Sequence, residues 1–196
     1  MMNNNVLIIS CSLLHNYIHT EMFVKSMHTM LTGEIKNVDI RDVHCFDMSS
    51  FSQYDTVLFI YELSMGTLPS VAITLLKQLE TVSKHADIYC IAATDLYEPE
   101  ACEISCRQLE RWAQLNHLNY MGSLMIGSLY LQNYLSIRMV TKAYLKRLSK
   151  AIKENSQISL QTTCFSMKQF MKLGNIYWKK EIKKKQKELS KKMKNQ

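Results

Sequence analysis

The chain of 196 residues is long enough for one domain with a sizeable core, and its apolar and aromatic content excludes a disordered protein. Its formal net charge of +7 comes from the end of the chain. Residues 178–196 contain nine lysines and two glutamates, whereas residues 1–177 contain 15 basic and 15 acidic side chains. A body with no net charge argues against a general nucleic-acid-binding domain, which usually has a basic face.

The six cysteines form no C-x-x-C pair, and no group of histidines and cysteines has zinc-finger spacing. We expect reduced structural thiols rather than a disulfide framework, because several cysteines lie in apolar segments. The six histidines do not cluster, so no metal site is expected. The N-terminus lacks the basic segment of a signal peptide, and no apolar stretch reaches about 18 residues. We therefore expect a cytoplasmic protein with no membrane span.

The first part of the chain predicts a strand, a helix and a second strand. Residues 6–9 form a continuous apolar run, which is typical of a strand buried on both faces. Apolar side chains then recur with a helical period from Met22 to Leu31, and Gly33 marks the end of that helix. Residues 35–40 have the pattern of a weaker strand.

The middle of the chain alternates between buried strands and amphipathic helices. Strands are predicted over residues 56–61 and 87–92, and the helix between them has apolar residues at helical spacing from Val71 to Val82. Pro99 is expected near the first turn of the next helix, where its missing N–H costs no hydrogen bond.

The last part predicts a strand over residues 120–126, bounded by Gly127, and a long helix over 135–152. This alternation is typical of a parallel α/β sheet with helices on both faces, a three-layer sandwich with five strands. We expect an α/β domain over residues 1–155 and a helical extension over 156–196.

One apolar stripe runs along the lysine-rich end of the extension. Its members recur at spacings of 4, 7 and 4 residues: Trp178, Ile182, Leu189 and Met193. The pattern favours a solvated helix with one packed apolar edge. Two alternatives are docking on the body or a second subunit, and binding to the anionic surface of a membrane or nucleic acid.

Three loops follow the buried strands and together carry a family resemblance. Residues 10–20 (Ser-Cys-Ser-Leu-Leu-His-Asn-Tyr-Ile-His-Thr) follow the first strand, and 66–69 (Gly-Thr-Leu-Pro) follow the strand that Asp55 precedes. Residues 94–98 (Thr-Asp-Leu-Tyr-Glu) follow the predicted strand over residues 87–92. Over roughly residues 5–150 the chain resembles the NAD(P)H-dependent FMN reductase family, which has the flavodoxin-like fold.

The resemblance implies that the first loop holds the phosphate of FMN. The residues implied as phosphate contacts are Ser10, Ser12, Asn16, Tyr17, His19 and Thr20. Hydroxyl and imidazole donors beside a helix N-terminus suit an anion. The alternative is that Asn16, or His19 with Thr20, only caps the helix.

The resemblance also implies that the second and third loops border the flavin ring. The residues concerned are Ser64, Met65, Gly66 and Thr67 in the second loop and Thr94, Asp95 and Tyr97 in the third. Met65 would lie against the ring and Tyr97 would stack on it; an ordinary turn and simple packing are the alternatives. Glu62, at the end of its strand, is expected to face solvent.

The activity that the resemblance implies is electron transfer from NADPH or NADH through FMN to a quinone, free flavin or similar small acceptor, by a homodimer. No catalytic side chain is required, because the flavin carries the chemistry. The first loop contains no glycine, whereas the family uses one or two there for close backbone approach. This departure supports an alternative function, a flavin-free binding or interaction module of the same fold.

Overall fold

The computed structural model describes residues 5–12, 18–45, 48–81, 85–163 and 166–194. They form one parallel sheet with the strand order β2-β1-β3-β4-β5-β6. The strands are β1 (Asn5–Ser10), β2 (Asn37–Asp42), β3 (Thr56–Glu62), β4 (Asp87–Ala93), β5 (Asn119–Ile126) and β6 (Ile158–Thr162). The five predicted strands are confirmed, but the sheet has six strands, so the expected number was wrong.

The sixth strand lies at the edge of the sheet and has a short, polar sequence. Only Leu160 and Thr162 of β6 are buried, and its other residues alternate toward solvent. Gly122 of β5 lets β6 approach, since a Cβ built there would lie 1.7 Å from the carbonyl oxygen of Ile158. Met121 is an extra residue in the pairing of β5 with β4, a bulge that accompanies the positive φ of 133° at Gly122.

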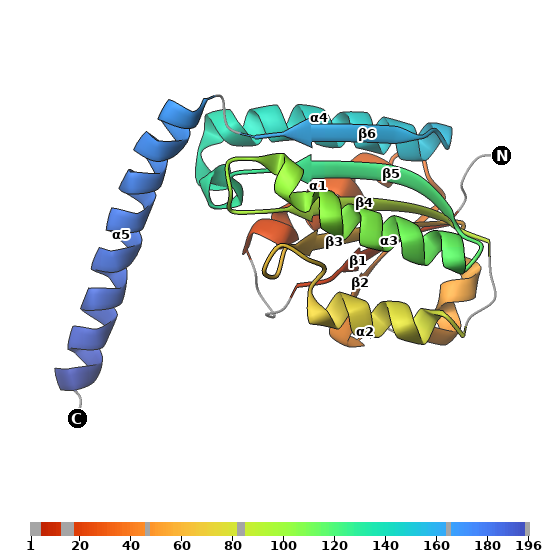
Figure 1. Cartoon of the computed structure of the whole chain (residues 1–196), viewed down its shortest axis with the longest axis horizontal. Helices are drawn as coiled ribbons and strands as arrows, with labels where there is room; N and C mark the ends of the chain where they lie inside the picture. The colour runs from red at the N-terminus through yellow and green to blue at the C-terminus, as the bar shows by residue number, and fades with distance from the viewer. Residues whose placement is uncertain (1–4, 13–17, 46–47, 82–84, 164–165, 195–196) are drawn as a thin grey trace.

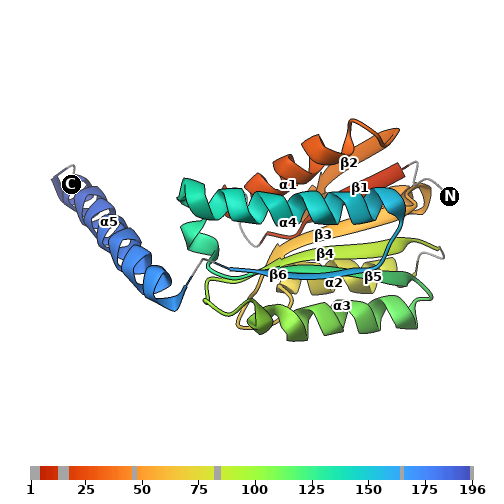
Figure 2. The ribbon, with the colours of Figure 1, turned by 90° about the horizontal axis from the view of Figure 1, so that it is seen from above.

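Helices cover both faces of the sheet, as expected for the three-layer sandwich. One pair is α1 (Ile18–Leu31) and α4 (Leu135–Glu154), and the other is α2 (Ser70–Leu79) and α3 (Glu103–Leu115). Figure 2 shows the sheet between these two pairs. The segment between β2 and β3, which has no helical or strand period, contains the 3₁₀ turns η1 (Val43–Cys45) and η2 (Met48–Gln53).

The core follows from strands that are buried along their whole length. Every residue of β4 is buried, and so is every residue of β3 except Glu62. The Phe59 ring packs edge-to-face on Trp112 with centroids 6.2 Å apart, and Trp112 Nε1 donates to the carbonyl of Leu76 at 3.1 Å. These contacts join the sheet, α3 and α2 into one apolar layer.

The last helix, α5 (Met167–Lys194), leaves the body at the edge where the strands end (Figure 1). Within the described residues, no helix combines the length and apolar character needed to cross a membrane. The five described cysteines are free, and four of them are buried; Cys164 lies outside the described residues.

Candidate functional site

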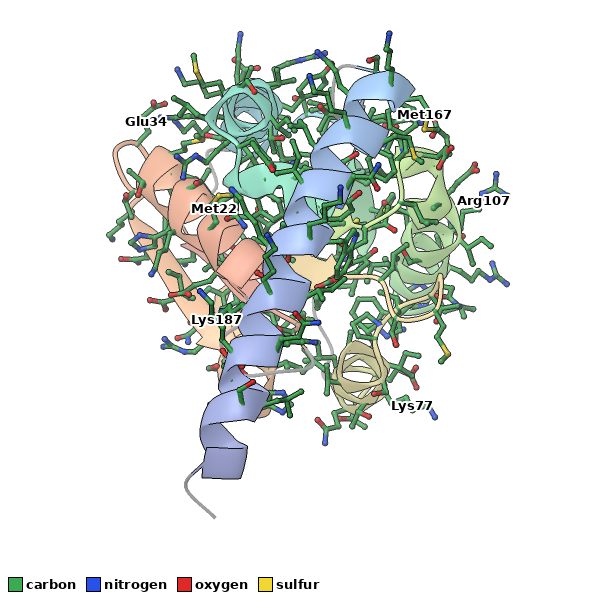
Figure 3. All side chains as sticks on the ribbon, turned by 90° about the vertical axis from the view of Figure 1, so that its left-hand side faces the viewer. Met22, Glu34, Lys77, Arg107, Met167 and Lys187 are labelled. Carbon is green, nitrogen blue, oxygen red and sulfur yellow. The ribbon has the colours of Figure 1, made fainter. Side chains whose placement is uncertain are left out.

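The candidate site lies where the strand order reverses. β1 lies between β2 and β3, and the chain leaves β1 toward α1 on one face but leaves β3 toward α2 on the other. Loops that diverge from neighbouring parallel strands leave a crevice at their carboxyl ends, where such sheets bind ligands. Figure 3 views this edge of the sheet, with α5 passing in front of it.

The first loop brings hydroxyl groups to the start of α1. Ser10 is the last residue of β1, and the Cys11 N–H donates to the carbonyl of Ile60 at 2.8 Å, so the loop leaves the sheet only after that residue. Ser12 is buried, and Thr20 lies buried in the first turn of α1. The first-turn N–H groups of a 14-residue helix lack intrahelical partners and favour an anion.

The structure adds one residue to this loop that sequence reasoning missed. His44, from η1, places its Nε2 3.3 Å from the carbonyl oxygen of Ser12. Asn16 and Tyr17 lie outside the described residues, and His19 is described only as part of the helical backbone of α1. Three of the six predicted phosphate contacts, Ser10, Ser12 and Thr20, therefore have a described position beside β1 and α1.

The second loop is a tight two-residue turn. Ser64 and Thr67 exchange two backbone hydrogen bonds of 3.0 Å, with Met65 and Gly66 between them at positive φ values of 51° and 81°. This backbone suits glycine at position 66 and fixes the path of the loop. The Met65 side chain is fully exposed at the tip, where it is available to cover a flat ligand.

The third loop is tied to the ends of β5 and β6. The Thr94 N–H donates to the Ile126 carbonyl at 2.9 Å, and Asp95 Oδ1 accepts from the Tyr130 N–H at 3.2 Å. Gly127 passes so close that a Cβ there would lie 2.4 Å from the Tyr97 carbonyl oxygen. The loop is therefore held by hydrogen bonds and close contacts within the protein, including one to the Asp95 side chain.

Tyr97 packs against α5. Its ring lies edge-on to Phe170 with centroids 5.5 Å apart. Burial, followed by the charges of Glu181 and Asp95, raises the pKa of Tyr177 on α5. The first part of α5 thus forms one wall beside the third loop.

An acidic pair lies at the ends of β3 and β4. Burial, and secondarily the negative charge of Asp95, raises the pKa of Glu62 to about 7. The carboxyl group is partly buried and partly exposed to solvent. Near neutral pH a large fraction of Glu62 is protonated and able to donate a hydrogen bond.

These residues fit the chemistry of a flavin nucleotide. Ser10, Ser12 and Thr20 supply neutral hydroxyl donors beside a helix N-terminus, which suits a phosphate. The turn at Met65 supplies an exposed polarizable side chain and backbone groups at the next strand end. Among the described residues, no three His, Cys, Asp or Glu side chains are placed to hold a metal ion.

Solved structures with similar folds were found, whereas no protein-family model matches the sequence and no curated protein is significantly similar. A flavodoxin from Fusobacterium nucleatum bound to flavin mononucleotide is 11% identical, with a TM-score of 0.58, and the match covers 78% of this chain and 99% of that one. An NADPH-quinone reductase from P. pentosaceus is 14% identical, with a TM-score of 0.57, over 74% and 97% of the two chains.

A third structure is a longer protein. Rubredoxin oxygen:oxidoreductase from Desulfovibrio gigas is 12% identical, with a TM-score of 0.59, and the match covers 78% of this chain but 37% of that one. The chain therefore spans about a third of that protein's length. Likeness at these identities concerns the fold, and with the strand order it shows that the chain has the flavodoxin-like fold.

Proposed function

We propose that the protein is an FMN-binding, NAD(P)H-dependent oxidoreductase of the FMN reductase kind. The observation that carries the proposal is the meeting of three loops at the reversal of strand order, with hydroxyl donors at the start of α1 and a tight turn after β3. The resemblance of the same three loops to that family supports it independently of the fold.

The chain's own residues would bind and orient the cofactor. Ser10, Ser12 and Thr20 would donate to the phosphate, while the backbone of the turn at Met65 would contact the polar edge of the ring. Protonated Glu62 would donate a hydrogen bond at the ring edge, and its ionised form would disfavour negative charge there. Bound FMN supplies hydride acceptance from NADPH or NADH and electron donation to a quinone, free flavin or similar small acceptor.

The enzymatic part of the proposal is tested with FMN-loaded protein, NADPH or NADH, and a soluble quinone. We expect oxidation of the nicotinamide that depends on both the protein and the acceptor, measured by loss of nicotinamide absorbance. Free FMN at the same concentration is the control. If the protein binds FMN but oxidises the nicotinamide no faster than free FMN does, the result would contradict the reductase activity but not the flavin site.

We further propose that the protein is a homodimer with this edge at the interface. Three exposed apolar side chains lie on the loops and helix start around the site: Met65, Leu96 and Ile104. Sedimentation velocity should give twice the chain mass of 22.8 kDa. A monomer at about 50 μM, a concentration at which a micromolar dimer is largely assembled, would contradict this.

A second candidate function is a flavin-free binding module of the same fold. Two observations favour it: the first loop has no glycine, and the negative charge of Asp95 acts on the carboxyl group of Glu62 beside the expected position of the ring. The two candidates differ in FMN affinity, since a module of this kind would leave purified protein colourless and FMN unbound.

A further inference from the structure

The helix α5 contacts the body with only its first half. Phe170 and Tyr177 pack on Tyr130 with ring centroids 5.7 and 5.1 Å apart. Gly174 lies between them, so close that a Cβ there would lie 2.7 Å from the Tyr130 hydroxyl oxygen. Beyond these contacts the helix projects away from the body, and its C-terminal end lies apart from the rest of the molecule (Figures 1 and 2).

A stripe of large apolar side chains runs along one side of α5, and one of its members, Trp178, also takes part in the docking contact, with its ring centroid 5.7 Å from that of Tyr130. Here the stripe comprises Trp178, Ile182 and Leu189 of the predicted stripe together with Met171, whereas the side chain of Met193 lies outside the described part of the chain. Each of the four stripe residues is between 52 and 60% exposed. At 100° per residue the four lie within about 40° of one another around the helix, whereas Phe170, Gly174 and Tyr177 are centred about 90° away. Docking on the body therefore covers one side of Trp178 but leaves each side chain of the stripe more than half exposed.

Lysines cover the rest of the same helix segment. Exposed Lys185 lies beside the stripe, and Lys180, Lys183, Lys184 and Lys187 are exposed about 120 to 180° around the helix from it. Residues 178–196 contain nine lysines against two glutamates. Lys187 is exposed, and Figure 3 shows it on the C-terminal half of α5.

These features distinguish between possible partners. A nucleic acid would attract the lysines but would leave Trp178 and the rest of the stripe exposed. A second α5 would cover the stripe but would bring two strongly positive segments together, which repel each other. An anionic lipid surface satisfies both features, because apolar side chains enter the headgroup boundary while lysines contact lipid phosphates.

We propose that α5 binds the surface of an anionic membrane, lying in the interface through the stripe and the lysines around it. The long methylene segments of the lysines reach back to the phosphates while the stripe is inserted. Because α5 leaves the body at the carboxyl ends of the strands, this edge is held beside the lipid surface. Membrane binding by α5 does not depend on flavin binding, so this proposal and the proposed oxidoreductase function can be tested independently.

The test is flotation of the full chain with vesicles of phosphatidylcholine alone or with about 30% phosphatidylglycerol, a content that gives an anionic surface. We expect binding to the anionic vesicles to exceed binding to neutral vesicles at least about tenfold and to weaken with salt. Trp178 fluorescence should shift to shorter wavelength, while Trp112 is buried in the core in either case. No preference for anionic vesicles would overturn the proposal.

Paired variants separate the stripe from a general charge effect. The double variant Ile182→Gln, Leu189→Gln should lose about tenfold in vesicle binding, because both substitutions keep good helix formers but remove apolar area. The control Leu115→Gln, Met139→Gln removes equally exposed apolar side chains from α3 and α4 and should bind vesicles normally. Equal loss in both pairs would overturn the role of the stripe.

The two alternative partners of α5, a second copy of the chain and a nucleic acid, would each give a different experimental result. If the parent protein self-associates but does not bind vesicles, and the Ile182→Gln, Leu189→Gln variant does not self-associate, the partner of the stripe is a second copy of the chain and not a membrane. If the protein binds duplex DNA more tightly than vesicles, and the stripe variant binds DNA as the parent does, the partner of α5 is a nucleic acid and not a membrane. Thermal melts of all variants establish that they are folded, which these exposed positions should allow.

Discussion

The carboxyl groups of Glu62 and Asp95 lie at the ends of the neighbouring strands β3 and β4. Burial together with the charge of Asp95 raises the pKa of Glu62 from an ordinary value of 4.5 to about 7. The folded protein therefore holds the Glu62 proton more tightly than the unfolded chain does. The resulting stabilisation is complete below about pH 4.5 and is lost as the pH rises through 7.

The first prediction concerns stability against pH. Between pH 5 and pH 8 the Glu62→Gln variant should gain about 1 to 2 kcal/mol in unfolding free energy relative to the parent, a figure reduced for partial solvent exposure. Urea denaturation at the two pH values measures the difference. The control Glu80→Gln, at an exposed position, should follow the parent. An unchanged pH dependence in Glu62→Gln would contradict the burial of this carboxyl group.

The second prediction concerns the close contact under the third loop. Gly127→Ala places a methyl group against the Tyr97 carbonyl oxygen and 2.9 Å from Thr163 Oγ1, so backbone must shift. The expected loss is more than about 2 kcal/mol of unfolding free energy. Gly33→Ala, with no atom within 4 Å of the new methyl group, should change it by less than about 0.5 kcal/mol. Similar values for the two variants would show that the loop lies farther from β5.

The third prediction concerns the connection between α4 and β6. The Tyr89 hydroxyl donates to the Ser156 carbonyl at 3.0 Å and lies 3.3 Å from that of Ala151. Tyr89→Phe should cost about 1 to 2 kcal/mol in urea denaturation, because it leaves partly buried carbonyls without this donor. Tyr144→Phe keeps the contact between its ring and Arg147 and serves as the control. A neutral Tyr89→Phe would mean that solvent replaces the hydroxyl.

The fourth prediction concerns the docking of α5. Phe170→Ala removes the ring that packs on both Tyr97 and Tyr130. Amide hydrogen exchange in residues 168–178 should accelerate at least about fivefold, since a contact of this kind contributes about 1 kcal/mol or more. Met171→Ala, on the exposed stripe, should leave exchange unchanged. Equal exchange in the two variants would contradict the docked position.

The sequence predicts the interior of the sheet well because its strands are buried on both faces. β3 and β4 are almost continuous apolar runs, and such runs have few alternatives. β6 was not predicted from the sequence, because this edge strand has five residues, of which only Leu160 and Thr162 are buried, and so lacks a continuous apolar run. Its place depends on Gly122 in a distant part of the chain, which local patterns do not contain.

The candidate site was predictable where residues follow a strand and unpredictable where distant segments meet. Ser10 and Thr94 follow buried strands, so their position at one edge could be inferred. His44 comes from a segment without helical or strand period, and no sequence signal places it beside the first loop. The burial of Glu62 depends on folded contacts between neighbouring strands, which composition does not show.

The central claim, a flavin site at this edge, is tested most directly by titrating FMN with the purified protein and following the quenching of FMN fluorescence. The account predicts saturable binding with a Kd of about 10 μM or tighter, weakened at least about tenfold by Thr20→Ala, which removes a hydroxyl beside the phosphate. Thr29→Ala, on the exposed side of α1, should bind as the parent does. No binding at about 100 μM FMN would contradict the claim and favour the flavin-free module.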